Sequence, residues 1–189
     1  MIQNYRELKD YLQADLNRYG HRKLKLLGWF CGDESYVVKR LLKRLRWLEY
    51  YTNKKKRLWD YPLYFICFLL YRRLRLKTGI HLEVNTIGKG LYIPHYGGGI
   101  YANCEKLGDF CIISSGVVLG IKGSGRKKGR PIIGNNVEIC VGAKVIGNVH
   151  VGNNVIIAPN SVVITDIPDN AIVSGVPAKI IKIKDIKDI

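Results

Sequence analysis

The stretch IIGNNVEICVGAKVIGNVHVGNNVIIAPNSVV, residues 132–163, carries an aliphatic residue at every sixth position. The members of this first series are Ile133, Ile139, Val145, Val151, Ile157 and Val163. A second series, mostly of smaller side chains, follows each of them by four residues: Val137, Ala143, Val149, Val155, Ser161 and Ile167. A period of six fits neither the 3.6-residue turn of an α-helix nor the two-residue alternation of a strand.

This period is the one found in hexapeptide β-helices, where three units complete one triangular coil. We therefore predict a solenoid whose interior is filled by both series. Pairs such as Gly134-Asn135 and Gly152-Asn153 supply the corners, because glycine and asparagine tolerate turn conformations. The pattern extends back through Ile87, Ile93, Leu107, Ile113 and Leu119, with Cys111 and Val117 as companions. These residues are expected to be core, so function should come from whatever interrupts the pattern.

One interruption lies between Leu119 and Ile133, where the step is fourteen residues instead of twelve. The intervening segment, 120–131, is rich in glycine and in basic residues. Such a segment cannot form the interior wall of a solenoid, so it is predicted to be an extruded loop, where binding residues are usually found.

Composition limits the possible classes of protein. With 47% hydrophobic and 24% charged residues, a chain of 189 residues can bury a core and is not disordered. The five cysteines are odd in number and form no CxxC pair, which argues against a disulfide framework or a zinc site. The N-terminus is charged and helix-patterned, unlike a signal peptide, so a reducing cytosolic compartment is expected.

The net charge of +16 is concentrated at the front of the chain. Residues 1–79 hold 19 Lys and Arg against 7 Asp and Glu, a net +12. Nucleic-acid binding would require a recognised module with interleaved aromatic residues, and none is present. Attraction to an anionic membrane surface explains the asymmetry more simply.

Helical spacing of apolar residues predicts one helix over 5–19 and a second that begins at about Ser35, a good N-cap residue. A third apolar run, 61–71, is too short for the roughly 20 residues that span a bilayer. We favour its burial against the other helices or a neighbouring subunit, with an interfacial membrane helix as the alternative.

The texture changes to β-branched residues and glycine after Thr78. The predicted domains are a basic helical region, 1–78, for oligomerisation or a membrane surface; the β-helix, 79–176, with the loop 120–131; and a C-terminal tail, 177–189.

Three motifs between about residues 78 and 182 resemble the hexapeptide acyltransferases of the serine acetyltransferase type. They are TIGKGLYIPHYGGGIYAN (86–103), the repeat array after the loop, and the closing GVPAK (175–179). The resemblance implies a left-handed parallel β-helix, homotrimers, acetyl-CoA as the acetyl donor, and active sites between adjacent subunits. Assembly of such trimers into larger complexes through the N-terminal helices is also left open.

In that family a histidine precedes the loop, and the matching residue is His95. Acetyl transfer to a hydroxyl needs a general base that works near neutral pH, which suits histidine. The glycines that follow allow close backbone approach and could present N–H groups to an oxyanion. The predicted oxyanion and acceptor region comprises Tyr96, Gly97, Gly98, Asn103 and Arg130.

By the same resemblance, acetyl-CoA is expected along the outside of the solenoid between two subunits. The residues assigned to it are Gly142, Ala143, Ala158, Ile164, Thr165, Lys179 and Lys182. The two lysines could meet the phosphates of CoA as mobile positive charges.

The chain departs from serine acetyltransferases at several site positions. The aspartate before the catalytic histidine is replaced by Pro94, and the one a coil earlier by Ile80. The Arg-His pair of the family's loop falls on Gly129 and Arg130. The sequence leaves open whether Glu83 or a carboxylate of another subunit orients His95.

These departures favour a sugar acceptor, free or lipid-linked, and the HYGG pattern looks like the sugar-modifying branch of the superfamily. The predicted function is therefore O-acetylation in capsule, exopolysaccharide or lipopolysaccharide synthesis, in the cytoplasm or at the inner face of the cell membrane. The enzymatic alternatives are serine O-acetylation and N-acetylation of a nucleotide-linked amino sugar. A trimeric membrane-surface scaffold is the non-enzymatic one.

Metal catalysis is not expected. Solenoids of this shape also occur in γ-class carbonic anhydrases, which need three histidines that converge on zinc. The spacings of His81, His95 and His150 do not match that arrangement, and His21 lies in the helical region.

Overall fold

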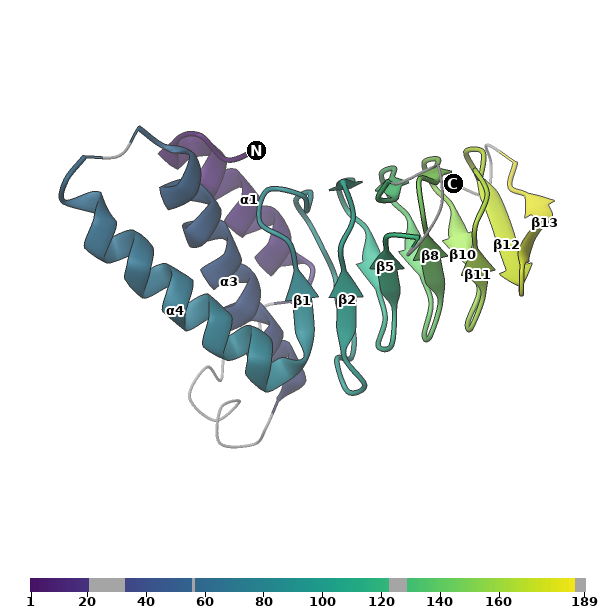
Figure 1. Cartoon of the computed structure of the whole chain (residues 1–189), viewed down its shortest axis with the longest axis horizontal. Helices are drawn as coiled ribbons and strands as arrows, with labels where there is room; N and C mark the ends of the chain where they lie inside the picture. The colour runs from purple at the N-terminus through teal and green to yellow at the C-terminus, as the bar shows by residue number, and fades with distance from the viewer. Residues whose placement is uncertain (21–32, 56, 123–128, 186–189) are drawn as a thin grey trace.

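The computed structural model describes residues 1–20, 33–55, 57–122 and 129–185. Within these ranges, three helices stand at one end of a solenoid of short strands (Figure 1). The N-terminal half of the chain therefore caps the start of the repeat region.

Each helix has identifiable end signals. Helix α1 (Tyr5–Asn17) begins after Asn4, whose side chain accepts the Glu7 N–H. Helix α3 (Glu34–Asn53) is capped by Asp33, so the predicted cap, Ser35, lies inside the first turn and donates its N–H to Asp33 at 2.9 Å. Helix α4 (Asp60–Thr78) ends at Gly79, which adopts the left-handed conformation typical of a C-terminal stop.

The strands form three sheets that the chain visits in turn. The first sheet contains β1 (Ile80–Leu82), β2 (Ile100–Ala102), β5 (Val118–Gly120), β8 (Lys144–Ile146) and β11 (Val162–Val163). The second contains β3 (Lys106–Leu107), β6 (Ile132–Ile133) and β9 (His150–Val151). The third contains β4 (Ile112–Ile113), β7 (Glu138–Ile139), β10 (Ile156–Ile157), β12 (Ala171–Gly175) and β13 (Ala178–Ile183).

All neighbouring strands are parallel except the last pair, β12 and β13, which is antiparallel. This arrangement confirms the predicted parallel β-helix. Strand β13 lies within the segment predicted as a tail, where it closes the end of the solenoid.

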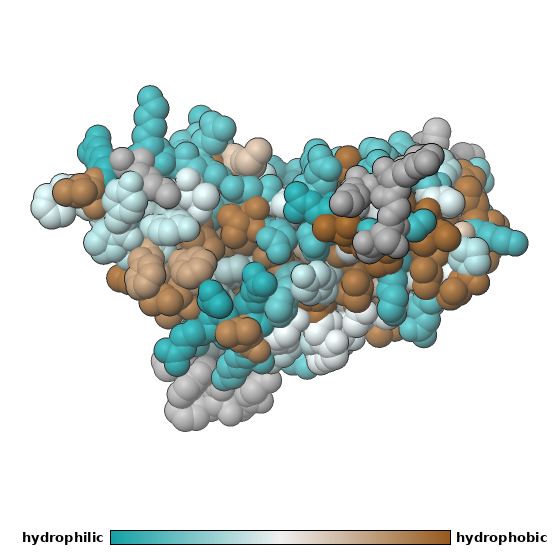
Figure 2. Space-filling view, viewed as in Figure 1, coloured by the Kyte–Doolittle hydropathy of each residue, from teal (hydrophilic) through white to brown (hydrophobic). Residues whose placement is uncertain are grey.

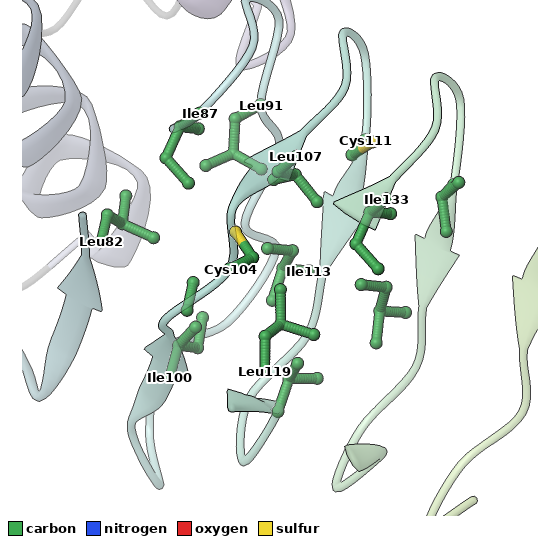
Figure 3. Close-up of a cluster of buried hydrophobic side chains, with 14 of the residues drawn as sticks. Leu82, Ile87, Leu91, Ile100, Cys104, Leu107, Cys111, Ile113, Leu119 and Ile133 are labelled. Atoms are coloured by element: carbon green, nitrogen blue, oxygen red, sulfur yellow. The ribbon is translucent and has the colours of Figure 1, made fainter. Parts of the chain in front are cut away.

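The interior of the solenoid is filled as the six-residue period predicts. Both series, from Ile133 to Val163 and from Val137 to Ile167, are buried, with at most 5% of any residue exposed. Figure 3 shows the earlier coils, where Leu107, Ile113 and Leu119 lie between the strands together with Cys111. Each large aliphatic side chain buried in this way contributes about 1.5–3 kcal/mol of transfer free energy.

The corner between the second and third sheets is held by a ladder of side-chain acceptors. The backbone N–H of Lys89 donates to Asp109, that of Asp109 to Asn135, that of Asn135 to Asn153, and that of Asn153 to Asp169, all at 2.7–2.9 Å. Each coil therefore satisfies a turn N–H of the coil before it. The Gly-Asn pairs of the sequence include two of these acceptors, Asn135 and Asn153, but not Asp109 and Asp169.

A buried ion network fixes the helices to the first coil. The guanidinium of Arg46 is fully buried and pairs with Asp15 at 2.8 Å and Glu49 at 3.0 Å. It also donates to the carbonyl oxygens of Ile87 and Gly88 at 2.8 and 2.6 Å. Because three elements meet at one cation, α3 has a defined position relative to the solenoid.

Within the described ranges, helix α4 buries only one of its faces. Cys67 and Tyr71 are buried, whereas Phe65 and Ile66 are 57% and 50% exposed. Burial against the other helices therefore accounts for half of the apolar run. In the described part of the chain, no helix is long and apolar enough to cross a membrane.

Candidate active site

The predicted site residues gather at two of the three corners of the solenoid. We call the turns that lead from the third sheet to the first the histidine corner; they comprise residues 94–99, 114–116, 140–142 and 158–160. We call the connections from the first sheet to the second the loop corner; its described residues are 103–105, 121–122, 129–131, 147–149 and 164–166. The remaining residues of the predicted loop, 123–128, lie outside the described residues.

His95 projects from the histidine corner beside the N-terminus of α3. Its Nδ1 atom lies 3.0 Å from a carboxylate oxygen of Glu34, the first residue of α3, and 79% of the imidazole side chain is exposed. When Nδ1–H donates to this carboxylate, the lone pair of Nε2 remains free to accept a proton. In that tautomer the histidine could act as a general base.

The residues after His95 form an open turn. The Gly99 N–H donates to the Tyr96 carbonyl at 3.0 Å, and Gly98 has a φ of 97°, which favours glycine. A Cβ atom at Gly97 or Gly98 would meet nothing within 4 Å, so the backbone there is accessible to a ligand. Tyr96 instead packs partly against the core.

The histidine corner continues as a column of backbone hydrogen bonds towards the C-terminal coils. The Gly116 N–H donates to Gly99, the Gly142 N–H to Ser115 and the Asn160 N–H to Val141, at 2.6–2.9 Å. His95 therefore shares one edge of the solenoid with two of the predicted CoA-binding turns.

Three residues of the predicted CoA groove lie at or beside this edge. Gly142 and Ala158 occupy the corner, and the side chain of Ala143 points into the buried interior. Their N–H groups are used inside the solenoid, since those of Gly142 and Ala158 donate at 2.9 Å and that of Ala143 at 3.2 Å. Contacts to an amide-bearing ligand would therefore use their carbonyl oxygens, each of which has two lone pairs.

The other predicted residues lie elsewhere. Asn103, Arg130, Ile164 and Thr165 lie at the loop corner, where Arg130 approaches the Asn103 side-chain oxygen at 3.5 Å. Lys179 and Lys182 are exposed on β13. The strands of the first sheet lie between the two corners, so within one chain Arg130 and His95 belong to opposite ends of these strands.

His81 and His150 do not join this site. His81 lies on β1, where burial and the nearby Arg75 guanidinium lower its pKa. His150 lies on β9, 3.8 Å from Asp166, and His21 lies outside the described residues. Among the residues described, no group of three or more His, Cys, Asp or Glu side chains could hold a metal ion.

Comparison with known proteins shows that the repeat region is similar to that of transferases. Residues 130–165 match the family model of the bacterial transferase hexapeptide (six repeats). A serine acetyltransferase of Synechococcus elongatus is 39% identical over 114 residues, 60% of this chain and 47% of the relative. One of Staphylococcus xylosus is 38% identical over 135 residues, 71% of this chain and 59% of the relative. The chain thus spans about half the length of the curated relatives it matches.

A solved serine acetyltransferase in complex with CoA superposes with a TM-score of 0.68 and 24% sequence identity, over 94% of this chain and 71% of that one. This similarity covers the helices as well as the repeats. It shows that the fold is the left-handed parallel β-helix with an N-terminal helical region.

These comparisons overturn the predicted sugar acceptor. The curated relatives cited above are serine acetyltransferases, so the preference for the polysaccharide-modifying branch is wrong. That preference rests on the aspartates replaced by Pro94 and Ile80, on the loop histidine replaced by Arg130, and on the HYGG pattern. In the structure, the carboxylate of Glu34 lies beside His95, although the two residues are 61 positions apart in the sequence. A motif comparison confined to the repeats does not detect this carboxylate.

Glu34 is the site residue that sequence reasoning missed. Glu83, the candidate in the sequence, lies after β1, where its carbonyl accepts the hydroxyl of Thr86. The only sequence signal for Glu34 is its place in Asp-Glu-Ser at the start of a helix, and such acids are commonly helix caps.

Proposed function

We propose that this chain, whose repeat region matches that of the bacterial hexapeptide transferases, is an acetyl-CoA-dependent O-acetyltransferase that acts on the hydroxyl of serine. The pairing of His95 with Glu34 beside an open glycine turn carries this proposal. The serine acetyltransferase relatives support the choice of acceptor, and the solved CoA complex supports the choice of donor.

His95 is assigned as the general base. Its Nε2 atom would take the proton of the serine hydroxyl while the hydroxyl oxygen forms a bond to the thioester carbonyl carbon. The carbon–sulfur bond then breaks, and His95 returns the proton to the departing thiolate. Glu34 stabilises the imidazolium that exists between these two proton transfers, because its carboxylate lies 3.0 Å from Nδ1.

The glycine turn is assigned to charge stabilisation and access. Negative charge develops on the carbonyl oxygen during attack, and preorganised N–H donors lower the energy of that state. Gly97 and Gly98 leave the backbone open on the side of His95, so an acyl group can approach without a side-chain clash.

We assign the complete site to two copies of the chain in a homotrimer. His95 lies in the turn that leads into β2 of the first sheet, and Arg130 lies in the connection that follows β5. A neighbouring copy that packs against the first sheet would bring its Arg130 towards His95, where a guanidinium could pair with the serine carboxylate. The lysines of β13 are assigned to the phosphates of CoA.

Mass spectrometry of the purified full chain with acetyl-CoA and serine tests the function. The expected products are free CoA and O-acetylserine in equal amounts. His95→Ala should lower kcat by about 10²–10⁴-fold, because it removes the general base. No serine-dependent formation of CoA would overturn the proposal. Turnover with a nucleotide-linked amino sugar but not with serine would assign the chain to the N-acetylating alternative.

A further inference from the structure

The acetyl-transfer chemistry makes no use of the outward face of α4. Large apolar side chains are exposed there and in the turn before the helix: Leu58, Trp59, Tyr61, Leu63, Phe65, Ile66, Leu69 and Leu76. We call these residues the α4 face. Exposure reaches 84% for Trp59 and 69% for Leu76. Figure 2 shows brown, hydrophobic side chains gathered in the region of α4. A contiguous apolar patch of this kind marks an interaction surface.

Three of the exposed residues follow helical spacing. Phe65, Leu69 and Leu76 lie at positions i, i+4 and i+11, which fall along one line of a helix with 3.6 residues per turn. Cys67 and Tyr71 lie on the opposite side and are buried. Helix α4 is thus apolar on both sides, and only one side has a partner within the described chain.

Basic residues border the α4 face at both ends. Lys55 and Arg57 precede its apolar residues, and Arg72, Arg73 and Lys77 lie around Leu76 in the last turns of the helix. All five are exposed, and none of them forms an ion pair with another residue in the described ranges. The acid of this helix, Asp60, pairs with Lys54 at 2.6 Å. The surface therefore combines an apolar centre with unneutralised positive ends.

We propose that the α4 face binds the interface of an anionic lipid bilayer. Basic flanks suit acidic headgroups, and exposed Trp, Tyr, Phe and Leu side chains suit the boundary of the acyl region. A second copy of the chain fits less well, since the same face of that copy would oppose five positive charges with five more. The helix cannot span a bilayer, so it lies in the plane of the surface.

A groove beside the α4 face adds to this complementarity. It encloses about 400 Å³ between α3 and α4 and is lined by Leu48, Tyr64, Phe68, Tyr71, Arg72 and Arg75, among others. Tyr64 and Phe68 stack at 6.4 Å, and the two arginines follow them along the helix. An aromatic wall that ends in two guanidinium groups suits an acyl chain attached to an anionic headgroup.

Vesicle flotation of the full chain tests this inference, which does not depend on the proposed function. We expect binding to vesicles of phosphatidylcholine mixed with phosphatidylglycerol, weaker binding in high salt, and little binding to phosphatidylcholine alone. Phe65→Ser combined with Leu69→Ser should weaken binding about tenfold or more. Arg73→Glu should weaken it about fivefold or more.

Two matched control variants lie on the solenoid. Ile181→Ser removes an apolar residue that is 69% exposed on β13, and Lys106→Glu reverses an exposed charge on β3. Both should leave vesicle binding within twofold of the unmodified chain. Circular dichroism checks that every variant remains folded.

Absence of binding to the anionic vesicles at low salt would overturn the inference, as would equal losses in the control variants. Light scattering tests the alternative that a second copy of the chain occupies the α4 face. If Phe65→Ser with Leu69→Ser lowers the oligomeric mass and leaves vesicle binding unchanged, the α4 face is a contact between copies of the chain and the inference is wrong.

Discussion

The carboxylate of Glu34 is the charge that lies against Nδ1 of His95, at 3.0 Å. Glu34→Gln keeps the size of the side chain and removes its charge. We expect kcat for serine to fall about tenfold or more with little change in the KM for acetyl-CoA, because the imidazolium loses its counter-charge. Glu34→Asp should retain more of the activity than Glu34→Gln.

Glu83→Gln is the matched control, since Glu83 is the carboxylate that the sequence alone suggests as a partner of His95. Steady-state kinetics should show kcat within twofold of the unmodified chain for this variant. A large loss in Glu83→Gln together with normal turnover in Glu34→Gln would contradict the assignment.

Two interior cysteines provide a pH-dependent test of burial. Burial raises the pKa of the Cys104 and Cys111 thiols to about 11. A raised pKa lowers the thiolate fraction at any pH below it, so at pH values of about 8 both thiols should resist iodoacetamide. Peptide mapping should find them unmodified in the folded chain and alkylated after denaturation. Rapid labelling of either residue in the folded chain would be inconsistent with burial of the two thiols in the interior of the solenoid.

At the scale of elements, glycine sets the spacing between coils at the corner between the second and third sheets. A Cβ atom at Gly134 would lie 2.6 Å from the carbonyl oxygen of Gly152 in the next coil. Gly134→Ala should therefore destabilise the fold by about 1–3 kcal/mol, because backbone must move to relieve the overlap. Urea unfolding measures this change.

Gly97→Ala is the control for stability, since a Cβ atom there meets nothing within 4 Å. Its free energy of unfolding should stay within about 0.5 kcal/mol of the unmodified chain. Equal stability of the Gly134→Ala and Gly97→Ala variants would show that the coils can separate at no cost.

At the scale of the whole molecule, the two site corners predict that activity belongs to an assembly. His95→Ala and Arg130→Ala should each be inactive or nearly so. The two variants can be mixed in equal amounts, denatured and refolded as mixed trimers. About one quarter of the sites should then combine an intact His95 with an intact Arg130 from a neighbour. Recovered CoA release, with a trimeric mass by light scattering, checks this expectation. A mixture as inactive as its components would argue against a shared site.

The repeat pattern was enough to predict the solenoid and its core, and the motif around residue 95 singled out a candidate general base. The six-residue period is a local pattern, and each Ile or Val of the series is buried because its own coil places it inwards. His95 is a candidate on similarly local grounds, since it belongs to a contiguous motif with its glycines.

The groups that face these elements come from segments distant in the sequence. Glu34 reaches His95 because Arg46 fixes α3 to the first coil through contacts with residues 31 and 41 positions away in the chain. The side of α4 that faces outward is determined by the packing of its other side, which contains Cys67 and Tyr71. Periodicity reports which side of an element is apolar, whereas the partner of that side depends on contacts between segments distant in sequence, and a local pattern does not encode them.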